Sequence, residues 1–137
     1  MAMPALPFVT AFYAALTGIL CVILSALVIR QRMRSRVSLG DGGDAAMGRM
    51  SRVFGNFAEY AALVLVLLGL LEICHGSRTL IHALGIAFIV SRLAHAFGLA
   101  RTTDVNPGRA AGIVVTLLVI LVASIALLVI VGRKIFV

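Results

Sequence analysis

The chain has 137 residues, of which 62% are hydrophobic and only 12% are charged. Soluble domains are about half apolar and about a quarter charged, so this composition excludes both a soluble globule and a disordered chain and predicts a single membrane domain spanning residues 1–137. The formal net charge of +7 does not indicate binding to nucleic acid, because the basic residues stand between apolar blocks, as they do in membrane proteins.

Two segments are apolar and long enough to cross a bilayer without any charge. Phe8–Ile29 has 22 uncharged residues and Ala110–Gly132 has 23, whereas about 20 helical residues span the hydrocarbon core. A helix is the open segment that satisfies its own backbone groups in lipid. Both segments are therefore predicted to be transmembrane helices.

The middle of the chain is less uniform. Its two uncharged segments, Tyr60–Leu71 and Thr79–Ser91, are short. Each reaches spanning length only by carrying Glu59 or Arg92 into the membrane, where a central charge costs about 2.5–3.5 kcal/mol. The sequence thus predicts an all-α integral membrane protein, a four-transmembrane-helix bundle with helices at approximately 6–30, 44–75, 78–100 and 107–134. The two inner helices must have polar faces that avoid lipid.

Turn residues mark the breaks between these helices. The segment Val37–Asp44 is rich in glycine and polar residues, and Asp44 is a predicted helix N-cap. In the turn between the second and third predicted helices, Gly76 is predicted to end the second helix at its C′ position, and Ser77 is predicted to be the N-cap of the third helix.

The distribution of lysine and arginine predicts the orientation. Three basic residues, Arg78, Arg133 and Lys134, fall on one side of the membrane, and the other nine fall on the side of the first and third loops. By the positive-inside rule these two loops are cytoplasmic and both termini are outside. Arg34 and Arg36 are interpreted as part of this topology signal, in contact with anionic lipid.

No pattern in the chain indicates a metal site. Cys21 and Cys74 stand in apolar surroundings, which is typical of inert packing residues. The sequence has no CxxC, HExxH or P-loop pattern.

Polar residues follow one stripe of the second helix. Arg52, Asn56, Glu59 and Tyr60 are spaced i, i+4, i+7 and i+8, which places them within about 100° of arc. Glu59 is expected roughly 10 Å inside the cytoplasmic boundary, at 1.5 Å per residue.

The third helix adds Arg92 and, one turn later, His95. Arg92 is expected at nearly the same depth as Glu59, and a pair between them would remove the cost of burying either charge alone. The polar cluster would then either fasten the bundle or bind a ligand. Intramembrane polar bonds average only about 0.6 kcal/mol, which favours a binding site. Considered singly, Tyr60 and His95 each have a structural alternative that is equally favoured. Tyr60 could be an aromatic residue at the membrane interface, and His95 a core histidine whose hydrogen bonds are satisfied within the bundle.

The surplus of arginine indicates an anionic ligand, since guanidinium groups form paired contacts with carboxylates. Glu59 and Asn56 would receive an ammonium or amide of the same ligand, and the apolar helices leave room for a lipophilic second substrate. Glu72, His75 and His82 lie toward the opposite side of the membrane and are interpreted as boundary or structural residues.

The motif Arg52-x-x-x-Asn56-x-x-Glu59-Tyr60 resembles the second-helix signature of the MAPEG family, the membrane-associated proteins in eicosanoid and glutathione metabolism. The segment VSLGDGG (Val37–Gly43) and the stretch Arg92-Leu93-Ala94-His95 resemble the bacterial members and the microsomal prostaglandin E synthase branch. The resemblance covers nearly the whole chain and implies a bacterial, microsomal-glutathione-transferase-like protein of the inner membrane. It also implies a homotrimer that binds glutathione between neighbouring subunits at the cytoplasmic end.

The resemblance further implies the roles of individual residues. The glutathione ligands would be Arg32, Arg52, Asn56, Glu59, Tyr60, Arg92 and His95. Arg109, or alternatively Arg101, would stabilise the glutathione thiolate. Two residues depart from the family pattern. Ala62 replaces a proline, which affects the shape of the helix more than the chemistry. Leu99 replaces a tyrosine, which favours a general detoxifying transferase over an eicosanoid enzyme.

The implied activity is that of a glutathione transferase with possible peroxidase activity. Glutathione is the co-substrate, no metal takes part, and the thiolate attacks a lipophilic electrophile or a lipid hydroperoxide presented from membrane lipid. The alternative is a non-catalytic relative that binds lipid or a partner protein. A small proton-coupled multidrug exporter is disfavoured, because Phe8–Ile29 has no carboxylate.

Overall fold

A computed structural model describes residues 6–101 and 107–136, apart from the side chains of residues 98–101 and 109. Its elements are α1 (Phe8–Ser35), α2 (Ala45–Ile73), α3 (Arg78–Arg101) and α4 (Pro107–Phe136). The described residues contain no strand, and each helix includes a segment long and apolar enough to cross a membrane. The protein is therefore an all-α four-helix membrane bundle, as the sequence predicts.

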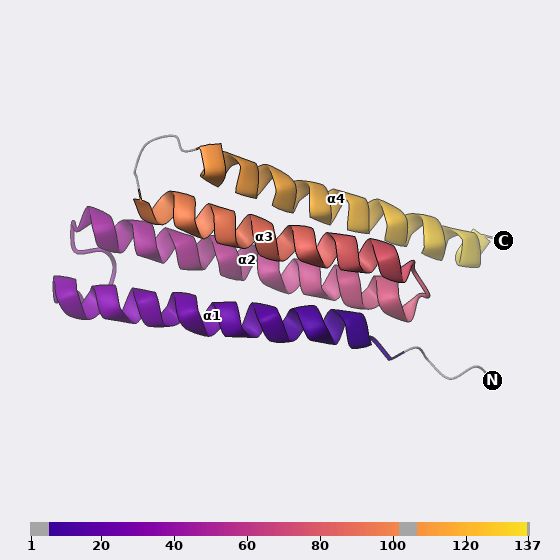
Figure 1. Ribbon diagram of the computed structural model, residues 1–137, viewed down its shortest axis with the longest axis horizontal. Coiled ribbons are helices and arrows are strands. Elements are labelled where there is room, and N and C mark those ends of the chain that lie inside the picture. The colour runs from indigo at the N-terminus through magenta and orange to yellow at the C-terminus, as the bar shows by residue number, and fades with distance from the viewer. Residues whose placement is uncertain (1–5, 102–106, 137) are drawn as a thin grey trace.

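The helices lie side by side and alternate in direction (Figure 1). Both α2 and α3 contact all three other helices, whereas α1 and α4 form the two flanks and do not contact each other in the described part of the chain. We call the end at which α1 and α3 finish and α2 and α4 begin the basic end, since Arg30, Arg34, Arg49 and Arg52 lie there.

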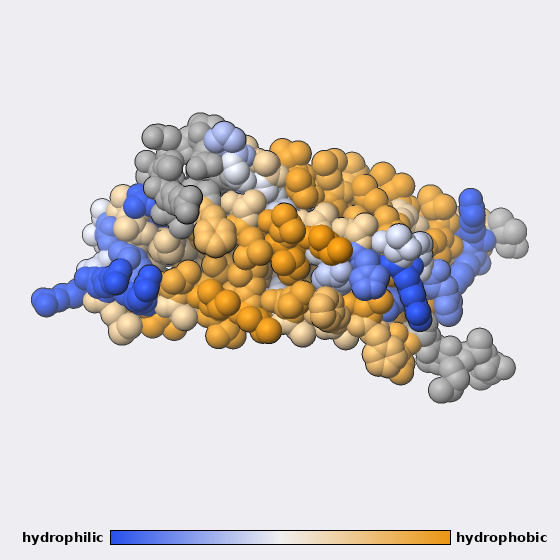
Figure 2. Space-filling view, viewed as in Figure 1, coloured by the Kyte–Doolittle hydropathy of each residue, from blue (hydrophilic) through white to orange (hydrophobic). Residues whose placement is uncertain are grey.

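The distribution of side chains is that of a membrane protein. Large apolar residues such as Ile19, Val22 and Leu128 are exposed, whereas polar residues such as Ser91 and Thr116 are buried. On the face shown in Figure 2, apolar side chains cover the middle of the bundle and hydrophilic side chains gather at its two ends. Apolar side chains can face lipid at no cost, so the interior is where polar groups find partners.

Helix α1 is longer than the sequence analysis predicts, because it runs to Ser35 instead of ending near residue 30. Its last turn is tied to the start of α2. Asp44 is the N-cap of α2, as predicted, and accepts from the Ala46 N–H at 2.8 Å. The Asp44 carboxylate also accepts hydrogen bonds from Ser35 and Gln31. The hydrogen bond from Ser35, followed by that from Ala46, lowers the pKa of Asp44 below its usual value.

The turn between α2 and α3 corrects one prediction. The residue in the left-handed conformation is His75, with φ of 62°, and not Gly76. The His75 N–H donates to Glu72 O and the Gly76 N–H to Leu71 O, which is the hydrogen-bond pattern of a Schellman motif with His75 at C′. Glycine is needed at position 76 for another reason, because a Cβ there would lie 2.8 Å from Leu71 O.

A second set of polar contacts fastens α1 at the opposite end of the bundle. The Glu72 carboxylate accepts from the backbone N–H groups of Val9 and Thr10 at 2.9 and 2.7 Å. These two groups belong to the first turn of α1, whose N–H groups have no partner within the helix. The hydroxyl of Tyr13 lies 3.1 Å from Nδ1 of His82. The structural interpretation of Glu72 and His82 is confirmed by these contacts.

Candidate functional site

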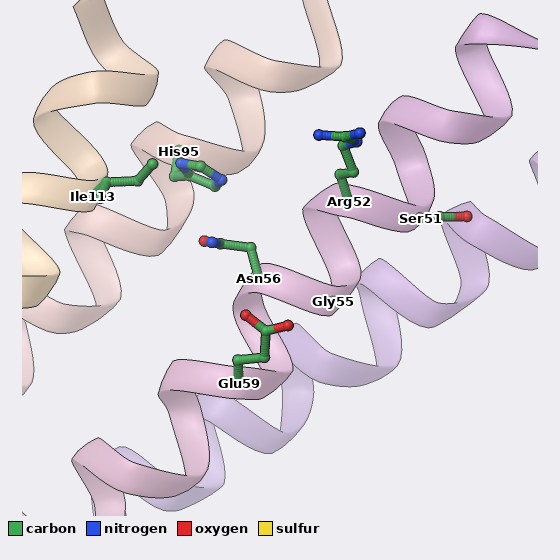
Figure 3. Close-up of a pocket in the computed structure, with 7 residues that line it drawn as sticks. All are labelled: Ser51, Arg52, Gly55, Asn56, Glu59, His95 and Ile113. Carbon is green, nitrogen blue, oxygen red and sulfur yellow. The ribbon is translucent and has the colours of Figure 1, made fainter.

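A polar pocket opens at the basic end, between the start of α2 and the neighbouring parts of α3 and α4. Its cavity volume is about 560 Å³, within the usual range for small-molecule sites. The lining residues, shown in Figure 3, are Ser51, Arg52, Gly55, Asn56, Glu59, His95 and Ile113. We refer to this cavity as the polar pocket.

One face of α2 supplies most of the pocket. Arg52, Asn56 and Glu59 project from successive turns toward the same side of the helix (Figure 3). Arg52 and Glu59 are exposed and lie seven residues apart, which is about 10 Å along the axis. The pocket therefore presents a cation at one end and an anion at the other. This arrangement suits an extended zwitterionic ligand.

Arg92 is buried, with 2% of its surface exposed, and does not line the polar pocket. Its Nη1 donates to Asn56 Oδ1 at 2.8 Å, and its Nη2 donates to Gly112 O at 2.9 Å and to the Thr116 hydroxyl. The predicted pair between Arg92 and Glu59 is wrong. Among the described residues, the guanidinium bonds to α2 and α4 through neutral oxygen acceptors, and Glu59 remains exposed in the pocket.

The crossing of α3 and α4 makes these contacts possible. A Cβ on Gly112 would lie 2.7 Å from Ser91 O and 3.0 Å from the backbone nitrogen of His95, so only glycine lets the two backbones approach this closely. One turn further along α4, the Thr116 hydroxyl lies 2.8 Å from that of Ser91. Arg92 thus joins three helices directly behind the pocket.

The contact with Arg92 fixes the orientation of the Asn56 amide. A guanidinium has no acceptor, so the amide oxygen must face Arg92 and the Asn56 NH₂ group is left to donate. Asn56 therefore offers hydrogen-bond donors to the pocket, which suits a carboxylate or carbonyl and not the ammonium considered in the sequence analysis.

Two further predicted ligands lie outside the pocket lining. Tyr60 is half-buried, and the Cζ atom of Arg92 lies 5.6 Å from the centre of its ring, within the range of a cation–π contact. Arg32 donates to the carbonyl oxygens of Ser38 and Gly40 in the α1–α2 loop. Of the seven predicted glutathione ligands, the structure brings four into the pocket lining, namely Arg52, Asn56, Glu59 and His95.

The two arginines considered for thiolate stabilisation are at the ends of helices beside the pocket. Arg101 is the last residue of α3, and Arg109 lies in the first turn of α4. Their side chains lie outside the described part of the structure.

Comparison with known proteins identifies the family. The family model described as "MAPEG family" matches residues 10–129. The chain belongs to the MAPEG family. It is also similar to the inner membrane protein YecN of Escherichia coli strain K12, with 36% identity over 90 residues, covering 66% of this chain and 69% of YecN. YecN of the Escherichia coli O6:H1 strain CFT073 matches equally well. These findings support a multi-pass protein of the inner membrane.

Several residues at the polar pocket were not predicted from the sequence. Ser51, Gly55 and Glu59 are spaced i, i+4 and i+8 on α2, so Ser51 and Gly55 lie on nearly the same stripe as Glu59. This helical spacing was a signal that could have found them. Ile113 and Thr116 carried no such signal. Their place at the site depends on how α4 packs against α3.

Proposed function

We propose that this MAPEG protein is a membrane-bound glutathione transferase with peroxidase-like activity, and that glutathione binds in the polar pocket. The observation that carries the proposal is the stripe of Arg52, Asn56 and Glu59 along one wall of a cavity at the basic end. The stripe matches the family's second-helix signature, and its charges suit a peptide that carries both carboxylates and an ammonium.

Each pocket residue would bind a different group of glutathione. Arg52 would bind a glutathione carboxylate through its guanidinium, and the Asn56 NH₂ group would donate to a carboxylate or carbonyl oxygen nearby. Glu59, about 10 Å further along α2, would receive the ammonium group. Arg92 and Tyr60 would act one layer behind, by holding Asn56 and the three helices in place.

The chemistry requires a thiolate, because a thiol with a pKa near 8.5 is mostly protonated at pH 7. A guanidinium beside the sulfur favours the thiolate, and Arg109, with Arg101 as the alternative, is proposed for this role. The thiolate would then form a carbon–sulfur bond with a lipophilic electrophile as the leaving group departs. In the peroxidase reaction, two glutathione molecules would be oxidised to the disulfide as the hydroperoxide is reduced to an alcohol and water.

A homotrimer is part of the proposal. The polar pocket is lined from α2, α3 and α4, so an arginine on α1 such as Arg32 would reach glutathione only from a neighbouring subunit. We also propose that the basic end faces the cytoplasm, where the positive-inside rule places it and where glutathione is abundant.

The first test is a calorimetric titration of glutathione into the detergent-purified protein, in two buffers with different ionisation heats. Saturable binding with buffer-dependent heat at pH 7 is expected, because thiolate formation releases a proton. Arg52→Gln should weaken binding, while the control Arg78→Gln, at the opposite end, should leave it unchanged. The absence of binding heat in both buffers would instead support a lipid-binding or partner-binding scaffold.

The second test separates binding from catalysis. Arg109→Ala should abolish conjugation of a lipophilic electrophile to glutathione and largely spare glutathione binding. Undiminished turnover in this variant, combined with loss of turnover in Arg101→Ala, would assign thiolate stabilisation to Arg101.

A further inference from the structure

A second cavity lies at the same end of the bundle, but it is apolar. It is a groove with α1 and α3 as its walls and α2 as its floor, and its volume is about 280 Å³. Its lining residues on α1 run from Leu20 to Leu27, about two turns of the helix, so the groove follows the helix axis. Its lining residues are Leu20, Ile23, Leu24, Leu27, Met50, Val53, Leu93, Ala96 and Phe97. We refer to it as the apolar groove.

The apolar groove has a closed floor and an open rim. Leu24 and Val53 are 5% and 4% exposed, whereas Ile23 and Phe97 on the rim are 51% and 63% exposed. The groove is thus open along its length on the apolar surface of the bundle, where lipid chains would meet it in a bilayer.

The groove is separate from the polar pocket. Met50 and Val53 face the groove, while Arg52 and Asn56 face the polar pocket. Met50 and Arg52 are two residues apart, or about 200° around the helix at 3.6 residues per turn. The body of α2 therefore stands between the two cavities. A thiolate held in the polar pocket would not reach a molecule in the groove, so an occupant of the groove has a role outside the proposed reaction.

Cations stand where the groove reaches the basic end. The α1 residues of the groove, from Leu20 to Leu27, form a stripe that continues to Arg30 and Arg34 at helical spacing. These two exposed arginines lie about 4 and 10 Å beyond Leu27 along the axis. On the floor of the groove, Arg49 lies one turn before Val53 on α2. The groove thus combines an apolar channel with a cluster of guanidinium groups at one end, and the hydrophilic side chains there adjoin the apolar surface in Figure 2.

We propose that the apolar groove binds one acyl chain of an anionic phospholipid, whose phosphate contacts Arg30 and Arg34. The direction fits, because the groove runs along the helices and therefore parallel to lipid chains in a bilayer. Its length also fits, since Leu20 to Leu27 spans about 10 Å and one leaflet's hydrocarbon is about 15 Å thick. The arginines supply the selection for a negative headgroup.

The size and charge of the groove favour a lipid over a second copy of the protein. The groove offers about 280 Å³, which suits one hydrocarbon chain, and the guanidinium groups at its end attract an anionic headgroup. A second copy of this chain is itself basic, with a formal net charge of +7.

The proposal can be tested by native mass spectrometry of the detergent-purified protein, titrated with dioleoyl phosphatidylglycerol or with dioleoyl phosphatidylcholine. Tighter retention of the anionic lipid is expected. Replacing both Arg30 and Arg34 by Gln should lower its affinity by about fivefold for each arginine removed and leave the neutral lipid unchanged. The control Arg133→Gln/Lys134→Gln makes the same change of charge at the opposite end and should have no effect.

A second variant tests the groove itself. Ala96→Phe should fill the space and reduce the retention of both lipids, with helicity unchanged in circular dichroism. Equal retention of the two lipids by the wild type would overturn the proposal, as would equal effects of the two charge variants. A changed oligomeric mass in Ala96→Phe would show that protein and not lipid covers the groove. Displacement of phosphatidylglycerol by an equimolar amount of oleate would assign the groove to a free fatty acid instead.

Discussion

The link between Thr116 and Arg92 gives the sharpest test of how the site is held. Thr116 is fully buried, and its hydroxyl accepts from the Arg92 guanidinium, lies 2.8 Å from the Ser91 hydroxyl and donates to Gly112 O within its own helix. Thr116→Val keeps the shape of the side chain and removes all three contacts. The Arg92 guanidinium would then lose one acceptor in a place that water does not reach.

The expected loss of stability in Thr116→Val lies between the hydrogen-bond contributions measured in soluble proteins and those measured in membrane proteins. Hydrogen bonds to charged groups contribute about 1.5–3 kcal/mol in soluble proteins, and interhelical ones in a membrane protein average about 0.6 kcal/mol with a maximum near 1.7. Arg92 retains Asn56 and Gly112 O as acceptors. We therefore expect Thr116→Val to lower the free energy of unfolding by about 1.5 kcal/mol.

The assay is reversible unfolding in mixed detergent and sodium dodecyl sulfate, followed by circular dichroism. Thr17→Val is the matched control. Thr17 is also buried, and its hydroxyl donates to Tyr13 O, four residues back in its own helix, as that of Thr116 does to Gly112 O. The difference between the two variants therefore isolates the interhelical contacts. Equal destabilisation by both variants would refute the reasoning that Arg92 fastens α4 through Thr116.

Three further predictions follow from the same contacts. Gly112→Ala should destabilise the protein by about 1–3 kcal/mol, because the added methyl group overpacks the crossing of α3 and α4, whereas Gly132→Ala, in open space on the same helix, should be neutral or slightly stabilising in the same unfolding assay. Glu72→Gln should lower the free energy of unfolding by about 2 kcal/mol, because it weakens the cap of α1, and should leave the affinity for glutathione unchanged. Glu59→Gln should lower the affinity for glutathione and leave the free energy of unfolding unchanged. Unfolding and binding are measured on both variants. The native pKa of Asp44 is lowered, so its carboxylate stabilises the fold above an unfolded-state pKa of about 4, and this contribution is lost as the pH falls through the lower native value. The difference in the free energy of unfolding between wild type and Asp44→Asn should therefore disappear in acid. A difference that persists in acid would contradict this assignment.

The local features of the fold were readable from the sequence because they depend on neighbouring residues. Apolar length predicted the spanning helices, and the N-cap roles of Asp44 and Ser77 followed from residue type and position. In the structure, Asp44 accepts from the Ala46 N–H and Ser77 from the Leu80 N–H. Helical spacing alone placed Arg52, Asn56 and Glu59 on one wall of the pocket.

Other features depended on how the helices cross. Charge and depth predicted that Arg92 would pair with Glu59, because a buried cation needs compensation and the nearest anion in the sequence pattern was that carboxylate. In the structure, Nη1 and Nη2 of Arg92 donate to neutral oxygens of Asn56 and α4 instead. Spacing along a single helix could not predict this, since the acceptors lie on two other helices.

By itself, then, the sequence determined that the chain crosses a membrane as four helices and that α2 carries a polar stripe, because hydropathy and the 3.6-residue repeat act within one helix. Only the tertiary structure decided which polar groups would be buried together and which would face a ligand. The physical reason is the close approach at Gly112, which brings Thr116 to Arg92, occupies the guanidinium within the bundle, and leaves Arg52 and Glu59 as the charged groups of α2 that line the polar pocket.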